Sequence, residues 1–249
     1  MRYKPGKHRL PPFNGFGILL VDKPILWTSF DVVNFVRNRF NVPKVGHCGT
    51  LDPAATGLLV LVLGKFTSYS DRLAGEDKCY EADMLLGVET SSGDIDGEVL
   101  CRKDASGVTE EQVKNVLDGF LGEQLQMPPM VSAVKVDGQK LYDLARKGIE
   151  VERQARPITI HSLDVMEYDL PRCRFSLACS KGTYVRTLCS DAGKKLGTGA
   201  MLTNLRRTRS GRFDIKNALT VEQIKTFSQE DLARHLAQGL IHLAGEENQ

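Results

Sequence analysis

The sequence predicts an α+β fold, and three segments near its start indicate it. Residues 16–24 (FGILLVDKP) form an apolar run that stops at a proline, which is typical of a buried strand that ends in a turn. Residues 28–40 carry an apolar stripe behind Thr28 or Ser29 as caps, so we expect a helix there. Residues 57–64 (GLLVLVLG) are short and rich in Leu and Val, which favours a second buried strand.

The rest of the chain continues this mixture of strands and helices. Further elements are expected as follows: a strand over 80–88, a loop or hairpin over 87–100, a helix over 109–122, a strand over 174–180, a turn and helix over 182–197, and two short helices over 220–243. Residues 126–160 differ, because they hold two adjacent prolines, a VDG turn and a basic amphipathic helix around 141–146. That composition is more typical of an inserted arm than of a core layer.

The charges of this chain of 249 residues nearly balance overall but are unevenly distributed. It has 33 basic and 31 acidic residues, a formal net charge of +2. Residues 172–212 hold ten Lys or Arg against one acid, whereas residues 76–98 hold eight acids against one Lys. We call residues 172–212 the basic block. Such a block indicates a polyanionic partner, and the alternative is a solvated surface.

Several function classes are not expected. The six cysteines form no C-x-x-C pair and the five histidines are scattered, so we expect neither a zinc site nor another metal. The basic N-terminus has no apolar segment of the kind that a signal peptide needs, and no apolar run approaches the length of a membrane span. A cytoplasmic protein with free thiols, without a membrane partner, is the expectation.

The stretch GHCGTLDPAATG (46–57) places Asp52 in a Gly- and Pro-rich turn at the mouth of a buried strand. An Asp before Pro is ordinarily explained by hydrogen bonds from neighbouring backbone N–H groups. Three features favour a further role. The glycines allow another molecule to approach the loop closely, His47 lies five residues upstream, and a strand end is a usual place for a rigidly held catalytic group.

Four other side chains have ordinary explanations when each is taken alone: a turn lysine (Lys23), half-buried aromatics (Tyr80 and Tyr184) and a surface arginine (Arg186). Their order along the chain is more specific. The chain resembles the TruB family of pseudouridine synthases from about residue 16 to about residue 213, in the segments LLVDKP…TSF, VGHCGTLDPAATGLLVLVLG, DKCYEADMLLG, MPPMVSAVKVDGQKLYDLARKGIEV, RPITI and CSKGTYVRTLCSDAGKKLGTGAMLTNLRRTRSG. The G-H-x-G-x-L-D-P-x-A-x-G element is the most specific of them.

The resemblance implies a pseudouridine synthase fold, with a mixed central sheet flanked by helices, and makes Asp52 the catalytic carboxylate. The implied reaction detaches uracil from C1′ of a uridine, rotates the base and rejoins it through C5, without a cofactor. Whether Asp52 attacks C1′, adds to the base or acts as a base at the sugar is open. Arg186 is expected to pair with Asp52, and Tyr80 to stack on the base and take part in proton removal at C5. Tyr184 and Leu205 are expected to wall the pocket.

Further positions are implied to contact the RNA or to hold the site. His47 is expected beside the flipped nucleotides, where it wedges between them or contacts phosphate. Lys23 and Pro24 are expected to support the aspartate loop. An arm at 126–156 is expected to clamp the RNA. The candidate phosphate contacts are basic side chains of this arm and of the basic block: Lys140, Arg146, Lys147, Arg206, Arg207 and Arg209.

We expect a catalytic domain over 10–215 and a short helical tail over 216–249. About 35 residues follow Arg212, too few for the RNA-binding PUA domain of many relatives. The implied function is isomerisation of uridine 55 in the T loop of tRNA by a monomer that binds the T arm. Two alternatives stay open. One is a guide-RNA-dependent synthase, which the short tail disfavours. The other is a tRNA-binding or RNA-folding protein whose catalysis is incidental.

Overall fold

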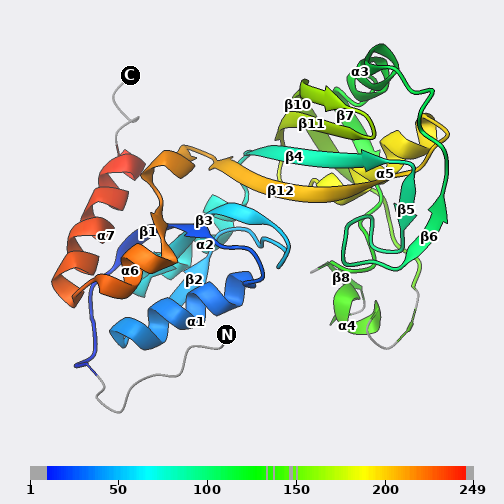
Figure 1. Cartoon of the computed structure of the whole chain (residues 1–249). Coiled ribbons are helices and arrows are strands. Elements are labelled where there is room, and N and C mark those ends of the chain that lie inside the picture. The colour runs from blue at the N-terminus through cyan, green and yellow to red at the C-terminus, as the bar shows by residue number, and fades with distance from the viewer. Residues whose placement is uncertain (1–9, 133, 137, 146–147, 150, 245–249) are drawn as a thin grey trace. The chain divides into compact units, whose positions relative to one another are not determined.

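The chain folds into two compact units in a computed structural model. The model describes residues 10–132, 134–136, 138–145, 148–149 and 151–244. The first unit takes in the chain up to residue 79 and from residue 206 onward, and the second takes in residues 80–205. Strands β4 (Lys78–Leu86) and β12 (Ala200–Ser210) contribute residues to both units (Figure 1). Each unit has its own apolar core.

The first unit is built on a sheet with the strand order β14-β1-β3-β12. Besides β12, the strands of this unit are β1 (Gly17–Lys23), β2 (Val45–His47), β3 (Thr56–Leu63), β13 (Phe213–Asp214) and β14 (Leu219–Thr220). β1 pairs with β3 in antiparallel fashion along all of β1. β12 runs parallel to β3 and pairs Arg206 with Thr56 and Arg207 with Gly57. This parallel pair brings the end of the basic block against the strand that follows Asp52.

Strand β3 is buried on both faces, which explains its uninterrupted apolar sequence. Alternate residues from Leu59 pack in a core with α1 (Ser29–Phe40), and alternate residues from Leu58 pack in a second core on the other face. The short helices η1 (Gly64–Tyr69), α2 (Ser70–Ala74) and η2 (Ile215–Asn217) complete this part of the unit. The strands predicted over 16–24 and 57–64 are confirmed.

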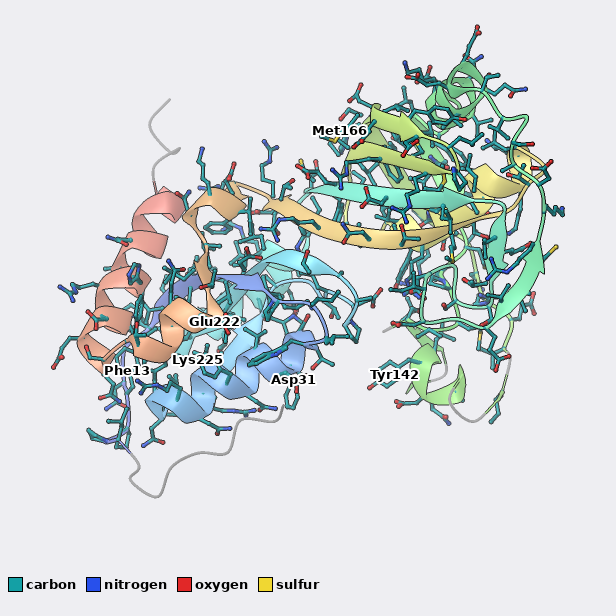
Figure 2. The ribbon with its side chains drawn as sticks, in the orientation of Figure 1. Phe13, Asp31, Tyr142, Met166, Glu222 and Lys225 are labelled. Carbon is teal, nitrogen blue, oxygen red and sulfur yellow. The ribbon has the colours of Figure 1, made fainter. Side chains whose placement is uncertain are left out.

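Helix α1 begins where its caps predict. The side chain of Thr28 accepts a hydrogen bond from the Asp31 backbone N–H, and the Asp31 carboxylate accepts one from the Thr28 backbone N–H. Figure 2 labels Asp31 at this end of the helix. The helix ends at Asn41, which is in the left-handed conformation with φ of 51°. The helix predicted over 28–40 is confirmed.

The C-terminal segment contributes to the core of the first unit. Its helices are α6 (Val221–Thr226) and α7 (Gln229–Ala244), which confirms two helices, although α7 is long. Val221, Ile224, Leu232 and Leu236 are buried in the same core as α1 and β1. β14 also pairs with β1, beside which Figure 1 shows both helices. The described residues after 215 therefore pack as part of this unit, and the domain bounds of 10–215 and 216–249 stay a prediction.

The second unit carries a sheet with the strand order β12-β4-β11-β10-β7. Its elements are β5 (Val88–Thr90), β6 (Val99–Arg102), α3 (Glu110–Asp118), β7 (Gly122–Gln126), β8 (Lys135–Val136), β9 (Gln139–Lys140), α4 (Leu141–Ala145), β10 (Arg156–Asp169), β11 (Arg172–Cys179) and α5 (Val185–Lys195). One apolar core joins this sheet to residues of α3 and α5. The strand β4, the hairpin β5–β6, the strand β11 and the helix α5 confirm predicted elements.

Several elements differ from the sequence predictions. Helix α3 stops at Asp118 rather than at 122, because residues from Gly122 onward pair with β10 as strand β7. The long strands β10 and β12 were not predicted, because exposed polar and charged residues interrupt the apolar pattern in both. Within the described part of the chain, no helix is long and apolar enough to cross a membrane.

Leu232→Ala should destabilise the protein markedly, because Leu232 on α7 is fully buried in the core that holds β1 and α1. Truncating a buried Leu costs about 2–5 kcal/mol, whereas the exposed ion pair of Glu222 with Lys225, labelled in Figure 2, contributes about 0–1 kcal/mol. Urea denaturation of Leu232→Ala and of the control Glu222→Ala measures both effects. Equal midpoints for the two variants would mean that α7 is not part of the cooperative fold.

Candidate active site

Asp52 lies in the loop between β2 and β3, and we call residues 48–55 the aspartate loop. Its backbone is fixed at several points. The Cys48 N–H donates to the Val60 carbonyl at 2.9 Å. The buried Ser29 hydroxyl, at the start of α1, accepts from the Leu51 N–H at 2.8 Å and donates to the Leu51 carbonyl at 3.1 Å. The residue directly before Asp52 is therefore held by a helix terminus.

Lys23, the last residue of β1, lies fully buried beneath this loop. Its Nζ donates to the carbonyls of Trp27 at 2.5 Å, Pro24 at 3.1 Å and Pro53 at 3.4 Å. Burial lowers the pKa of Lys23 to about 8, against the opposing attraction of the Asp52 carboxylate. The family resemblance implies that Lys23 supports the aspartate loop. The hydrogen bonds from Lys23 to the three carbonyls support that prediction.

Arg207, on β12, is a second buried cation below the loop, with 1% of its surface exposed. Its Nε donates to the Leu58 carbonyl at 2.7 Å, and a terminal nitrogen donates to the Gly49 carbonyl at 3.1 Å. The phosphate contact predicted for Arg207 therefore needs correction, because a side chain enclosed by the protein does not reach an RNA phosphate. Its guanidinium instead ties the start of β3 to the aspartate loop.

Two glycines make room for this arrangement. Gly57 has φ of +99°, and a Cβ there would lie 2.3 Å from the Arg207 carbonyl oxygen, a contact that backbone atoms cannot relieve. Gly49 has φ of +92° and faces the guanidinium of Arg207. The sequence predicts that these glycines leave room for another molecule. In the structure they admit the backbone and side chain of β12.

His47 ends β2 beside the same cation. Burial lowers the pKa of His47, and the positive charge of Arg207 lowers it further, while a hydrogen bond to the Gly49 backbone opposes the shift. His47 is therefore neutral at pH 7. Within the described residues, no hydrogen-bond partner reaches its buried Nδ1. The nucleotide contact expected of His47 stays a prediction, because this nitrogen is enclosed by the protein.

The turn before α1 is joined to the aspartate loop. Its Leu26 N–H donates to the Pro53 carbonyl at 2.9 Å. Leu26 has φ of 68°, in the left-handed region that costs a side-chain-bearing residue about 1–2 kcal/mol. Through Leu26 and Lys23, residues 24–27 and the Asp52–Pro53 turn form one hydrogen-bonded assembly.

In the second unit, Arg186 lies in the first turn of α5 and is 4% exposed. Its Nε is 3.4 Å from Oδ2 of Asp94, and its terminal nitrogens donate to the carbonyls of Val131 at 2.9 Å and Ser92 at 3.4 Å. Asp94 is itself held by the Ser92 hydroxyl and the Asp96 N–H. Arg186 and Asp52 belong to different units, and their pairing stays a prediction.

Asp94 is a site residue that the sequence analysis missed. The residues 87–100 were assigned to a loop or hairpin, and the excess of acids over 76–98 was the available signal. A partner for Arg186 among those acids could have been sought, since a buried guanidinium needs one. The identity of the acid that pairs with Arg186 depends on the fold, because an isolated bridge pairs Asp94 with Leu202.

The remaining aromatic and apolar candidates, Tyr80, Tyr184 and Leu205, belong to the second unit as well. Tyr184 caps α5, and its backbone N–H and carbonyl are both bonded by the buried side-chain amide of Gln126, at 2.7 and 3.1 Å. Tyr80 and Leu205 are partly buried and pack against the core of this unit. Gln126 is thus a second residue that the sequence analysis missed, because it lies 58 residues from Tyr184 along the chain.

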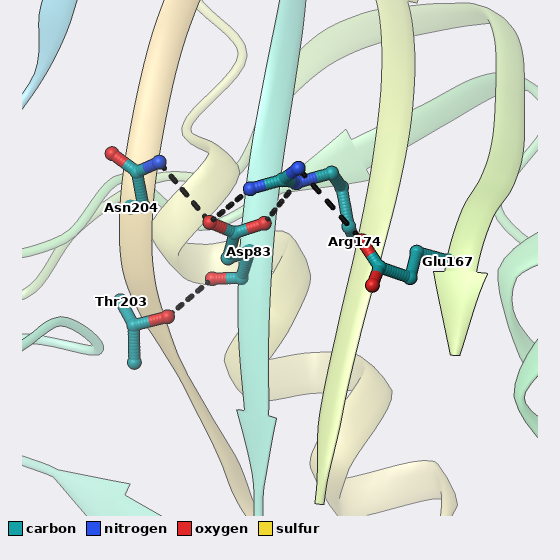
Figure 3. Close-up of polar contacts among 5 residues, drawn as sticks. All are labelled: Asp83, Glu167, Arg174, Thr203 and Asn204. Carbon is teal, nitrogen blue, oxygen red and sulfur yellow. Dashed lines mark hydrogen bonds and ion pairs between the residues drawn. The ribbon is translucent and has the colours of Figure 1, made fainter. Parts of the chain in front are cut away.

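Part of the basic block is used within the protein. Arg174 on β11 pairs with Asp83 on β4 at 2.7 Å, and Asn204 and Thr203 bond to the same residue from β12 (Figure 3). Burial raises the pKa of Asp83, but the hydrogen bonds from Arg174 and Asn204 outweigh it and hold that pKa below its usual value. Beside this network lies an open cavity of about 430 Å³.

The other predicted phosphate contacts have different surroundings. Arg206 forms a two-pronged pair with Asp22, at 2.7 and 3.1 Å, and stays partly exposed, while Arg209 is exposed. In the arm, Lys140 lies on β9 without a described side chain, and Arg146 and Lys147 lie outside the described residues. The structure therefore leaves the three arm contacts as predictions.

Metal ligation is not suggested by the described side chains. Among them, no group of three or more His, Cys, Asp or Glu residues is placed to hold a metal ion. Chemically, the first unit offers a fixed carboxylate beside buried cations, and the second offers a braced arginine and a braced tyrosine.

Comparisons with known proteins identify the family of this chain. The family model "TruB family pseudouridylate synthase (N terminal domain)" matches residues 37–185, and "tRNA pseudouridylate synthase B C-terminal domain" matches residues 186–241. The tRNA pseudouridine synthase B of Opitutus terrae is 47% identical over 88% of this chain and 91% of its own length. That of Clostridium tetani is 48% identical over 84% of this chain and 72% of its own length.

A solved structure gives the same fold. A chain from a crystal structure of a Cbf5–Nop10–Gar1 complex superimposes with a TM-score of 0.68 and 29% identity, over 89% of this chain. The match spans 60% of that chain. The α+β architecture is therefore that of a pseudouridine synthase. The chain belongs to the TruB family of pseudouridylate synthases, as the sequence predicted.

Lys23→Met should lower the free energy of unfolding by about 1–3 kcal/mol, because the buried carbonyls of Trp27 and Pro53 lose their donor. The deficit should be larger at pH 10 than at pH 7. The pKa of Lys23, about 8 when folded, lies below the 10.5 of the unfolded chain. The unfolded chain therefore binds more protons in this window, and wild-type stability gains as pH rises through it.

Urea denaturation at both pH values measures this difference. The matched control is Lys225→Met, an exposed lysine whose substitution should cost about 0.5 kcal/mol or less at either pH. A deficit for Lys23→Met that is the same at pH 7 and pH 10 would contradict the lowered pKa.

Proposed function

We propose that this chain isomerises uridine 55 in the T loop of tRNA to pseudouridine, with Asp52 as the catalytic carboxylate. The chain is a pseudouridine synthase by family. The observation that carries the assignment to Asp52 is its loop, which is fixed from below by the buried cations Lys23 and Arg207. Such fixing suits a carboxylate that must keep its position while a base detaches, turns and reattaches.

The other residues have roles that their surroundings support. Arg186, oriented by Asp94, would present its guanidinium to Asp52 and keep the carboxylate ionised and aimed. Tyr80 would stack on the target base, and Tyr184, with its backbone held by Gln126, would wall the pocket with Leu205. The uridine has to leave its stack to reach Asp52, which costs a few kcal/mol and least in a loop.

A tRNA substrate is favoured over a guide-RNA-dependent reaction by the degree of similarity. The identity to relatives named tRNA pseudouridine synthase B is 47–48%, against 29% to the chain from the Cbf5–Nop10–Gar1 complex. The T arm as the bound region, the clamp by the arm at 126–156, the monomeric state and the cytoplasmic location are part of the proposal. Incubation of the purified protein with an unmodified tRNA transcript, followed by mapping of pseudouridine by position, tests it.

Asp52→Asn should abolish turnover and leave tRNA affinity within a few-fold of wild type. Asparagine keeps the shape of the side chain but loses the charge that the chemistry needs, so the rate should fall below about one hundredth. The measurement is single-turnover pseudouridine formation together with a filter-binding Kd. Asp71→Asn, a surface carboxylate in the first turn of α2, serves as the control. A residual rate above one hundredth would remove Asp52 from its role.

Arg209→Ala should flatten the salt dependence of tRNA binding, because each phosphate contact adds about 0.7–0.9 to the log–log slope. Arg209 is the exposed member of the predicted trio in the basic block. Arg174→Ala is the matched control, since the pair with Asp83 already occupies that guanidinium. Titrations at four salt concentrations measure the slopes. An unchanged slope for Arg209→Ala would place the phosphates elsewhere on the protein.

A further inference from the structure

Three apolar side chains around the start of α1 are exposed to solvent. Ile25 and Leu26, in the turn before α1, are 54% and 80% exposed, and Phe30, in the first turn of α1, is 60% exposed. We call these three residues the apolar rim. Each of these side chains is large and apolar but mostly exposed, so it buries little surface in the core. Packing within the fold therefore does not explain its presence.

The backbone conformation of Leu26 is a second indication that this residue has a role other than packing. Leu26 and Asn41 are the non-glycine residues with positive φ in the described part of the chain. Glycine adopts this conformation freely, whereas leucine is strained in it. The chain therefore keeps a strained residue whose side chain is 80% exposed. Strain of this kind at an exposed position indicates a role outside the fold.

The rim is fixed relative to Asp52 by hydrogen bonds within the first unit. The Leu26 N–H donates to the Pro53 carbonyl at 2.9 Å, and Lys23 Nζ contacts the carbonyls of both Trp27 and Pro53. A ligand that binds at Asp52 therefore meets a preformed apolar surface at a set distance from the carboxylate.

We propose that Ile25, Leu26 and Phe30 form a platform on which unpaired bases of the substrate RNA pack, next to the uridine that enters the site. This inference rests on the proposed function and deepens it. A flipped nucleotide leaves its neighbours unstacked, and exposed apolar and aromatic side chains are what such bases pack against. The guanidinium of Arg37 lies 5.8 Å from the centre of the Phe30 ring, so a cation for the adjoining phosphate is close by.

Leu26→Gly tests the platform, because stability and binding should respond differently. Glycine relieves the backbone, so the thermal midpoint should stay the same or rise. The KM for an unmodified tRNA transcript should rise about tenfold, with kcat close to wild type, because the chemistry at Asp52 is unaltered. The log–log salt slope should not change, since an apolar contact releases no counterions.

Asn41→Gly is the matched control, because it relieves the other left-handed residue at the far end of α1. It should leave KM within twofold. Phe30→Ala should raise KM as Leu26→Gly does, whereas Phe30→Trp should leave KM close to wild type, since a larger ring still stacks. All variants are made in the full chain, and their KM, kcat and thermal midpoints are compared with the wild-type values. Loss of the proposed function would appear as an inactive wild type, whereas tRNA affinity still reports on the rim.

Three outcomes would overturn the platform. One is a KM for Leu26→Gly within twofold of wild type. Another is a lowered thermal midpoint with a parallel loss of kcat, which would make Leu26 a structural residue. The third is a wild-type dimer in sedimentation that Leu26→Gly dissociates, which would make the rim a contact between two copies of the chain.

Discussion

Lys23 and Arg207 are two cations buried beneath a loop that is made largely of small residues. Removing a cation from water is costly unless its hydrogen bonds are replaced. Here the replacements are main-chain carbonyls: Trp27, Pro24 and Pro53 for Lys23, and Gly49 and Leu58 for Arg207. The conformation of the aspartate loop is therefore set by where these carbonyls must point.

The two cations meet this cost in different ways. The pKa of Lys23 falls to about 8, so at pH 7 it is protonated in roughly a tenfold excess over its neutral form. Arginine cannot respond by losing its proton, so Arg207 depends wholly on its acceptors and on a close approach of β12 to β3. Gly57 permits that approach, and a side chain there would meet the Arg207 backbone. The conformation of the aspartate loop near residue 50 thus depends on the position of strand β12 near residue 207.

This dependence explains what could be predicted from sequence. β1, α1, β3 and α5 follow from apolar patterns and caps that lie within a few residues of each other. β12 has no such local signature, because its arginines are divided between solvent, Asp22 and the interior. The burial of Arg207 is fixed by its pairing with Gly57, 150 positions away, and no local pattern reports it. Family resemblance supplied Asp52 and Arg186, whereas Asp94 and Gln126 required the fold.

The distribution of cations also constrains how this protein holds RNA. In the basic block, Arg174 pairs with Asp83, Lys194 with Asp191 and Arg206 with Asp22, and Arg207 is buried. The number of basic residues in the sequence therefore overstates the charge that phosphates can meet. A cation that already pairs with a carboxylate contributes less to the salt-dependent part of binding than an unpaired one. Under the proposed function, contacts to the bases of an unpaired loop would supply a larger share of the affinity, since such contacts do not weaken with salt.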